Sequence, residues 1–236
     1  KVDLEALRRA VDGKTRMVVL NSPHNPTGKM FSRGELEEIA DIIRPFPNVV
    51  VLSDEVYEHL TYDEEQHISF ASLPGMYSRT VTLSSAAKTF GVTGWKIGWA
   101  IAPPHLMTPL QRAQQYVTFS VATPLQHAIA SALRTAALPY LGHPTYYHHL
   151  RAEFQRKRDS LLAALRAAGL SPTVPQGGYF VAAGVDKVEG FENAYPEEIA
   201  ALEAGGKVEV DGGTTGRRDY NFARWMTVRH GVTAIP

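Results

Sequence analysis

The sequence contains no cysteine among its 236 residues. A disulfide framework, a thiolate metal site and a cysteine nucleophile are therefore excluded for this chain. Charge of one sign is not in excess either, because 24 Lys and Arg residues balance 24 Asp and Glu residues. A balanced chain without a basic run does not favour nucleic acid or an anionic membrane as the main partner.

Long apolar runs are also lacking. No run approaches the ~20 residues that a membrane span needs, and no secretory leader is visible. We therefore expect a cytoplasmic protein. A mitochondrial location stays open, because the chain begins with Lys1 and not with methionine. The hydrophobic content of 44% is enough to build the core of one or two domains.

Three short apolar runs share one design. Each is rich in β-branched residues and is followed by polar residues. They cover residues 17–20, 49–52 and 80–83. Apolar runs that do not alternate are typical of parallel strands buried on both faces. Ligands bind at the carboxyl edge of such sheets, so we expect the polar residues after the three strands to meet in one crevice.

Helical patterns separate and follow these strands. Ser32 and Glu35 form a capping-box pattern before apolar residues at helical spacing, so the sequence predicts a helix between the first two strands. Residues 84–96 show no helical period and are expected to form a loop, with an antiparallel strand after them at 97–102. Helices are expected to dominate after residue 103.

The C-terminal part gives weaker signals. After a long amphipathic helix, Gly177 and Gly178 precede an apolar run at 179–181 that we interpret as a strand. Residues 203–219 are polar and rich in glycine, which indicates a surface loop. A last helix near 222–228 and a last strand at 232–235 are expected to follow.

Lys88 has the most informative surroundings in the chain. Small residues flank it, Ser85 lies three positions before it and Lys96 lies eight after it. A lysine amine becomes nucleophilic once it is desolvated or lies near another cation. This arrangement fits a lysine that forms an imine with an aldehyde cofactor while Ser85 and Lys96 bind a phosphate. The plain alternative is a solvated surface lysine.

Three motifs in this order resemble the class I/II aminotransferases, which are fold-type I enzymes that use pyridoxal 5′-phosphate (PLP). The motifs are Asn21-Ser22-Pro23-His24-Asn25-Pro26-Thr27-Gly28, Asp54-Glu55-Val56-Tyr57, and Ser85-Ala86-Ala87-Lys88 with Lys96. Residues 67–76, 118–124 and 231–236 resemble more narrowly the branch of kynurenine aminotransferase, glutamine transaminase K and methionine aminotransferase. Many relatives carry arginine where this chain has Lys96.

The resemblance implies an α/β fold. A mostly parallel sheet would belong to an incomplete PLP-binding large domain at 1–140, and a smaller, incomplete α+β domain would follow at 141–236. The family's chains are longer at both ends. The additional parts carry an aromatic residue that stacks on the PLP ring and an arginine that clamps the substrate carboxylate. The resemblance also implies a homodimer, and a fragment of one would expose apolar surface.

The resemblance also implies roles for the cofactor's ring contacts. Asp54 would keep the pyridine nitrogen protonated, which lets the ring accept electrons when the substrate loses its α-proton. Tyr57 and Asn25 would hydrogen-bond the ring's phenolate oxygen. The alternatives are a turn or cap residue for Asp54, an aromatic anchor for Tyr57 and a turn residue for Asn25.

The remaining roles concern the amine and the phosphate. Lys88 would form the resting imine and later move a proton as general acid and base. Ser85 and Lys96 would bind the phosphate, with a structural hydroxyl and a surface cation as their alternatives. Phe119 would either reach a substrate pocket across the dimer interface or belong to the core. No histidine has carboxylates at metal-ligand spacing, so no metal site is expected.

The leading hypothesis is therefore an enzyme that performs PLP-dependent transamination between an amino acid and a 2-oxo acid. Kynurenine, glutamine, methionine and aromatic amino acids are the candidate donors. Three alternatives stay open: a cysteine-conjugate β-lyase that uses the same site, a non-catalytic PLP-binding module, and an inactive truncated relative. Neither a nucleic acid nor a membrane is expected as a partner.

Overall fold

The computed structural model of the chain describes residues 2–190 and 218–236. These fall into two compact units. The first comprises Lys1–Ser160 and Val174–Val181, and the second comprises Leu161–Thr173 and Ala182–Pro236. All predicted site residues belong to the first unit. The division into a cofactor-binding domain at 1–140 and a smaller domain at 141–236 concerns the whole enzyme and stays a prediction.

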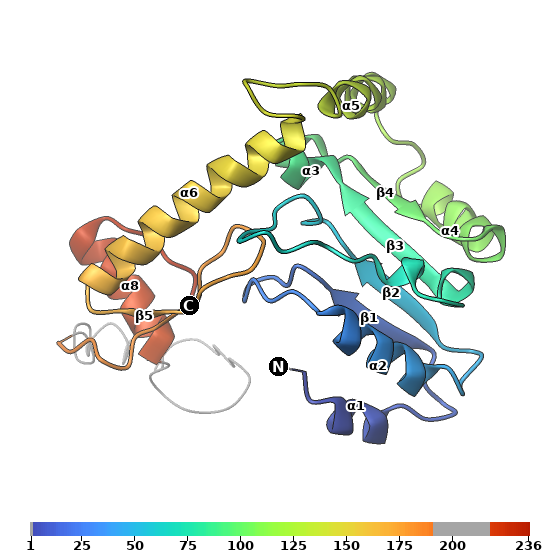
Figure 1. Cartoon of the computed structure of the whole chain (residues 1–236), viewed down its shortest axis with the longest axis horizontal. Coiled ribbons are helices and arrows are strands. Elements are labelled where there is room, and N and C mark those ends of the chain that lie inside the picture. Colours follow the sequence, from blue (N-terminus) through green and yellow to red (C-terminus); the bar gives the residue numbers. More distant parts are fainter. Residues whose placement is uncertain (1, 191–217) are drawn as a thin grey trace, which may run out of the picture. The chain divides into compact units, whose positions relative to one another are not determined.

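A four-stranded sheet organises the first unit (Figure 1). Its strands follow the order β1 (Met17–Asn21), β2 (Val50–Asp54), β3 (Thr80–Ser85) and β4 (Gly98–Ile101). The first three strands are parallel, and β4 is antiparallel to β3. Asn21 and Asp54 are register partners, so the polar residues after the strands lie at one carboxyl edge, as predicted.

Helix α2 (Arg33–Ile43) covers part of this sheet (Figure 1). Its N-cap Ser32 and Glu35 complete the predicted capping box, because each side chain accepts the other's backbone N–H. The buried residues of α2 are Leu36, Ile39, Ala40, Ile42 and Ile43. All of them except Ile42 pack with strand residues such as Val51 in one core cluster. The helical spacing in the sequence therefore identified the face that becomes core.

Strand β1 departs from the prediction of burial on both faces. Its Met17 and Val19 side chains are 53% and 63% exposed, whereas Leu20 is buried. The reason is that none of the described residues covers that face of β1, which is one of the two edge strands. By contrast, β2 has no exposed residue. The expectation that this chain exposes apolar surface is confirmed.

The segment 84–96 is more regular than predicted. A helical turn, α3 (Ala86–Thr89), begins directly after β3, and a 3₁₀ turn, η3 (Thr93–Trp95), precedes β4. The Ser85 side chain caps α3 by accepting the backbone N–H of Ala87. A single turn is too short to show a helical period, which explains why the sequence indicated a loop. This turn carries Lys88.

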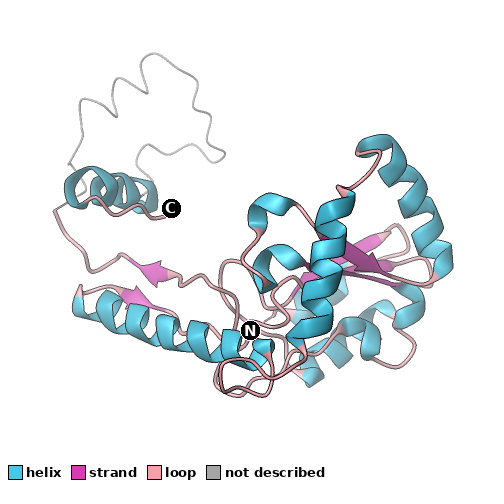
Figure 2. Cartoon of the chain, turned by 90° about the horizontal axis from the view of Figure 1, so that it is seen from above, coloured by secondary structure: helices cyan, strands magenta, loops and turns pink. Residues whose placement is uncertain are grey.

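Shorter elements and longer helices complete the first unit. They are α1 (Leu4–Ala10), η1 (Phe70–Ser72), η2 (Tyr77–Arg79), α4 (Pro104–Val117), α5 (Thr123–Ala136) and the first part of α6 (Tyr146–Ala167). Figure 2 shows the sheet with helices around it. Among the described helices, none combines the length and apolar character that crossing a membrane requires.

The second unit holds few regular elements. The two-residue strands β5 (Ser171–Pro172) and β6 (Ala183–Gly184) pair antiparallel, and α8 covers Arg218–His230. The prediction of a last helix is confirmed. The predicted strands at 179–181 and 232–235 are wrong, because neither segment makes a ladder of hydrogen bonds with another strand in the described part of the chain. Most of the predicted loop at 203–219 lies outside the described residues.

Candidate functional site

Asp54 occupies the carboxyl end of β2, where neighbouring backbone and side chains fix its position. Its carbonyl oxygen accepts hydrogen bonds from the Asn21 side chain at 3.0 Å and from the Ser22 N–H at 3.1 Å. Its carboxylate Oδ1 accepts the Val56 N–H at 3.3 Å. The side chain is half-buried. The backbone of Asp54 is therefore held, and its carboxylate keeps capacity to accept further hydrogen bonds.

Asn25 and Tyr57 lie near Asp54 at the carboxyl edge of the sheet. The Asn21 side chain accepts the Asn25 N–H at 2.8 Å, so one asparagine connects Asn25 with Asp54. Tyr57 is only 3% exposed. Burial raises the pKa of the Tyr57 phenol well above its usual value, the neighbouring Tyr179 and Asp54 raise it further, and the Asn25 amide opposes the rise. Tyr57 therefore stays protonated and keeps a proton to donate.

Lys88 reaches this edge from α3. Its Nζ donates a hydrogen bond to the Tyr179 hydroxyl at 2.7 Å. The same nitrogen lies 5.7 Å from the centroid of the Tyr57 ring and 5.2 Å from that of the Tyr179 ring. The two rings meet edge to face with centroids 5.2 Å apart. The amine thus lies between two phenol rings, at a distance that favours a cation–π interaction.

Tyr179 is the residue that sequence reasoning missed. Residues 179–181 were expected to form a strand, and no role was assigned to this tyrosine. Burial alone would raise the pKa of the Tyr179 phenol, but the hydrogen bond with Lys88 and the neighbouring Tyr57 outweigh that effect and lower it. The signal that could have found it is the Gly177-Gly178 pair before it, which is typical of a close backbone approach.

Those glycines attach the segment that carries Tyr179 to the rest of the unit. The Gly28 carbonyl accepts the N–H groups of Gln176 and Gly177 at 2.8 and 3.0 Å, and the Leu60 carbonyl accepts that of Gly178 at 2.9 Å. A Cβ added to Gly28 would lie 2.2 Å from Pro175 Cβ, and one on Gly177 would lie 2.6 Å from the Leu60 oxygen. Only glycine permits this approach.

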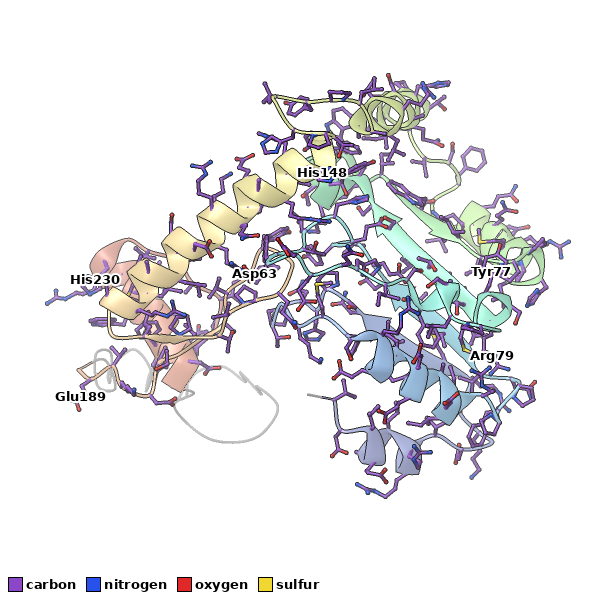
Figure 3. The ribbon with its side chains drawn as sticks, in the orientation of Figure 1. Asp63, Tyr77, Arg79, His148, Glu189 and His230 are labelled. Atoms are coloured by element: carbon purple, nitrogen blue, oxygen red, sulfur yellow. The ribbon has the colours of Figure 1, made fainter. Side chains whose placement is uncertain are left out.

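Two side chains strengthen the attachment. The buried Tyr62 hydroxyl donates to the Gly178 carbonyl, and burial raises the pKa of Tyr62 to about 12. Arg158, which is 7% exposed, donates to the Pro175 carbonyl at 3.2 Å and forms an ion pair with Asp63. Figure 3 labels Asp63 in this unit. The position of Tyr179 is therefore determined by its own segment and not by Lys88 alone.

Ser85 and Lys96 form a less constrained part of the site. Ser85 pairs with Gly98 across β3 and β4, which brings it near Lys96, two residues earlier in the chain. The Ser85 hydroxyl donates to the Ile97 carbonyl at 3.3 Å. Lys96 is exposed and adopts a left-handed conformation with φ of 57°. Its ammonium group makes no hydrogen bond or ion pair with any described residue.

We call Asn25, Asp54 and Tyr57 the carboxylate side of the site, and Ser85 and Lys96 the cation side. The structure joins the carboxylate side to Lys88 through Tyr57 and Tyr179. It places the cation side next to Lys88 in the chain, at the start of α3 and before β4.

Phe119 is 84% exposed, so the interpretation as a core residue is wrong.

A buried network supports the carboxylate side and was also missed. Glu55 is 2% exposed, and its Oε1 accepts from Ser53 Oγ at 2.7 Å, Ser69 Oγ at 3.0 Å and the Phe70 N–H at 3.2 Å. His67 Nε2 lies 2.8 Å from Oε2. A buried carboxylate requires such partners. Since Glu55 follows Asp54 directly, this network fixes the backbone that presents Asp54.

The donor set fits a cofactor that carries an aldehyde, a basic ring nitrogen, a phenolate oxygen and a phosphate. Lys88 supplies an amine held beside protonated Tyr57, and Asp54 supplies a carboxylate at a strand end. Lys96 supplies an exposed cation whose charge no described residue neutralises. Pyridoxal phosphate has these four features. The described residues include no group of three or more side chains that could hold a metal ion.

Comparison with known proteins agrees with this chemistry. Residues 1–236 match the family described as aminotransferase class I and II. The chain belongs to this family. Class I and II aminotransferases are fold-type I enzymes that depend on PLP, and the mixed, mostly parallel sheet described above matches that fold. The predicted family and fold class are confirmed.

Individual relatives narrow the comparison. Kynurenine–oxoglutarate transaminase of Dictyostelium discoideum is 42% identical over 237 residues, which cover 100% of this chain and 51% of the relative. N-succinyldiaminopimelate aminotransferase of Mycobacterium tuberculosis has a TM-score of 0.75 at 41% identity, over 86% of this chain and 50% of the other. Escherichia coli YbdL, described with a methionine aminotransferase function, has a TM-score of 0.81 at 31% identity. This match covers 100% of this chain and 53% of YbdL. The chain thus spans about half the length of these relatives.

Proposed function

We propose that the full-length protein transfers amino groups between an amino acid and a 2-oxo acid, with PLP as cofactor. The observation that carries the proposal is the Lys88 amine held beside Tyr57 at the edge where Asp54 ends β2. Membership of the aminotransferase family supports it. When bound, PLP supplies a ring that takes up the electron pair left as the substrate loses its α-proton.

The chain's own residues divide the work of holding this cofactor. Lys88 would bind it covalently through Nζ, and its freed amine would take the substrate α-proton, a role worth about 10²–10⁴-fold in rate. Asp54 would keep a proton on the ring nitrogen. Tyr57, protonated because burial raises the pKa of its phenol, would donate to the ring oxygen together with Asn25.

The phosphate would lie on the cation side. Ser85 offers a hydroxyl, and Lys96 offers an ammonium group that no described residue neutralises. Hydrogen bonds between an ammonium group and a phosphate are charge-assisted and stronger than neutral ones. These roles of the six predicted residues rest on the resemblance and on the geometry together.

The test is PLP binding by the cofactor-free, full-length protein. We expect a new absorbance band when PLP is added, and we expect Lys88→Ala to abolish it along with turnover. Lys14→Ala is the matched control, because Lys14 is an exposed lysine outside the site. An unchanged band in Lys88→Ala would refute the assignment of the covalent lysine.

For the amino donor we propose kynurenine, because the Dictyostelium relative carries that name and matches the whole chain. Methionine is the second candidate, since YbdL matches the whole chain as well. Initial rates with kynurenine, methionine, glutamine and aromatic amino acids rank the donors. Release of pyruvate from a cysteine conjugate would reveal the β-lyase alternative, and PLP binding without turnover would favour a non-catalytic module.

We also propose a homodimer. Helix α4 has no buried residue, and the segment from Leu110 to Phe119 exposes Leu110, Tyr116, Val117 and Phe119. Monomeric proteins rarely expose apolar side chains in such a group. Light scattering of the full-length protein tests this, and a monomer with unchanged turnover would contradict it.

A further inference from the structure

The Lys88 amine has one hydrogen-bond acceptor among the described residues, the hydroxyl of Tyr179 at 2.7 Å. Both aromatic rings beside the amine are phenols, and they contact each other edge to face. A lysine side chain has a flexible four-carbon stem, so its amine needs such contacts to remain in one place. The amine of this chain is therefore held before any cofactor is attached.

Tyr179 is itself held in place by contacts that do not involve Lys88. Hydrogen bonds from Gln176, Gly177 and Gly178 tie its segment to Gly28 and Leu60, and the Tyr62 hydroxyl donates to the Gly178 carbonyl. Since Gly178 directly precedes Tyr179, these bonds place the phenol at the site. Removing Lys88 would leave Tyr179 where it is.

We propose that Tyr179 is a positioning residue for Lys88: its hydroxyl holds the lysine amine while no cofactor is attached and releases it when attachment occurs. The holding follows from the contacts alone, and only the release rests on the proposed function. Tyr179, which lies 91 positions from Lys88 in the sequence, thus joins the residues that hold the amine in place.

The charges around Tyr179 allow its contact with Lys88 to be measured through the pKa of the Tyr179 phenol. The titratable groups that face its hydroxyl are the Lys88 amine and the Tyr57 phenol, and Asp54 acts on Tyr57. Burial opposes ionisation of Tyr179, whereas Lys88 and Tyr57 favour it and lower the pKa of the Tyr179 phenol. If the Tyr179 hydroxyl binds the Lys88 amine, removal of Lys88 should raise the pKa of the Tyr179 phenol.

The experiment is an NMR titration of the cofactor-free, full-length protein labelled with ¹³C at the tyrosine Cζ atom, which reports ionisation. Tyr179→Phe identifies the resonance of Tyr179 among those of the other tyrosines by its loss. In the unsubstituted protein we expect Tyr179 to titrate below the usual tyrosine value of about 10. In Lys88→Ala we expect its midpoint to rise towards that value, because the charged partner that lowers the pKa of the Tyr179 phenol is lost.

Adding PLP to the unsubstituted protein tests the release. We expect the Tyr179 midpoint to move upward, as it does in Lys88→Ala, because the attached amine no longer donates to the phenol. A midpoint that is the same in the unsubstituted protein and in Lys88→Ala would overturn the proposal. A midpoint that responds to Lys88→Ala but not to PLP would restrict Tyr179 to holding and overturn the release.

Two controls separate this result from general effects. Tyr77→Phe removes a phenol that is 52% exposed and lies before the start of β3 (Figure 3), so it should leave the Tyr179 midpoint unchanged. Tyr179→Phe keeps the ring that packs on Tyr57 and Phe180, so its melting temperature should change little. Absence of any PLP band would refute the proposed function, and the titration without cofactor would still decide the pairing of Tyr179 with Lys88.

Discussion

The carboxylate side and the cation side of the site are built differently. On the carboxylate side, Tyr57 is buried and Asp54 is held by backbone hydrogen bonds beside the Glu55 network. On the cation side, Lys96 is exposed and has no partner among the described residues. The fold therefore holds the residues of the carboxylate side in place, whereas the charge of Lys96 is neutralised by none of the described residues and is available to a ligand. Substitution of the buried Glu55 should thus reduce stability, whereas substitution of the exposed Lys96 should reduce mainly ligand affinity.

The largest expected effect comes from Glu55→Ala. It leaves the donors from Ser53, Ser69 and Phe70 without their buried acceptor, and breaking such a network costs about 3–5 kcal/mol. Denaturant unfolding at pH 7 measures the loss. Glu37→Ala is the control. Among the described residues Glu37 forms only an exposed ion pair with Arg33, so this substitution should change stability by less than about 0.5 kcal/mol. Equal effects of the two substitutions would contradict the supporting role of Glu55.

Gly28→Ala should have the next largest effect. Gly28 has φ of +67°, and an added Cβ would lie 2.2 Å from Pro175 Cβ. Left-handed strain and overpacking together cost roughly 2–4 kcal/mol. The control is Gly34→Ala in α2. A Cβ added to Gly34 would meet no neighbouring atom within 4 Å, so alanine should be neutral or stabilising there. Unfolding free energies of both variants give the comparison, and a stable Gly28→Ala would show that the segment carrying Tyr179 is not tightly packed there.

Tyr62→Phe should have a smaller effect that depends on pH. At neutral pH, loss of the hydrogen bond to the Gly178 carbonyl should cost about 1–2 kcal/mol. The pKa of Tyr62 is about 12 in the folded protein and about 10 in the unfolded chain. The raised pKa therefore stabilises the fold fully below about pH 10, and this contribution is lost as the pH rises towards 12.

The measurement is the free energy of unfolding at pH 7 and at pH 11. Tyr62→Phe should lose less stability between the two values than the unsubstituted protein does, because it lacks this ionisation. Tyr77→Phe, which removes an exposed phenol, should keep the original pH dependence. An unchanged slope in Tyr62→Phe would show that its phenol is not shifted as the structure indicates.

The smallest effect on stability belongs to Lys96→Ala. Because Lys96 is exposed, its removal should change the free energy of unfolding by less than about 0.5 kcal/mol. PLP affinity, measured by equilibrium titration, should fall about tenfold, which corresponds to the loss of roughly 1.4 kcal/mol of charged contact. Lys96→Arg keeps the charge and should bind PLP within a few-fold of the original protein. Unchanged affinity in Lys96→Ala would refute the proposed contact between Lys96 and the phosphate.

Local patterns were enough to predict a large part of this molecule. The capping box at Ser32, the apolar face of α2 and the three parallel strands all follow from residues close together in the sequence. The order of Asp54 and Lys88 after successive strands predicted that they would meet at one edge. These features were predictable because helical period, strand pattern and caps depend on neighbouring residues only.

The sequence by itself determined the family, the sheet and the residues that offer an amine, a carboxylate and a phenol. Tertiary structure alone decided which groups touch them. Tyr179 meets Lys88 across 91 positions, and Glu55 becomes buried because Ser69 and Phe70 fold onto it. Such contacts depend on the path of the backbone between distant segments, here the close approach of Gly28 to Pro175, and no local propensity encodes that path.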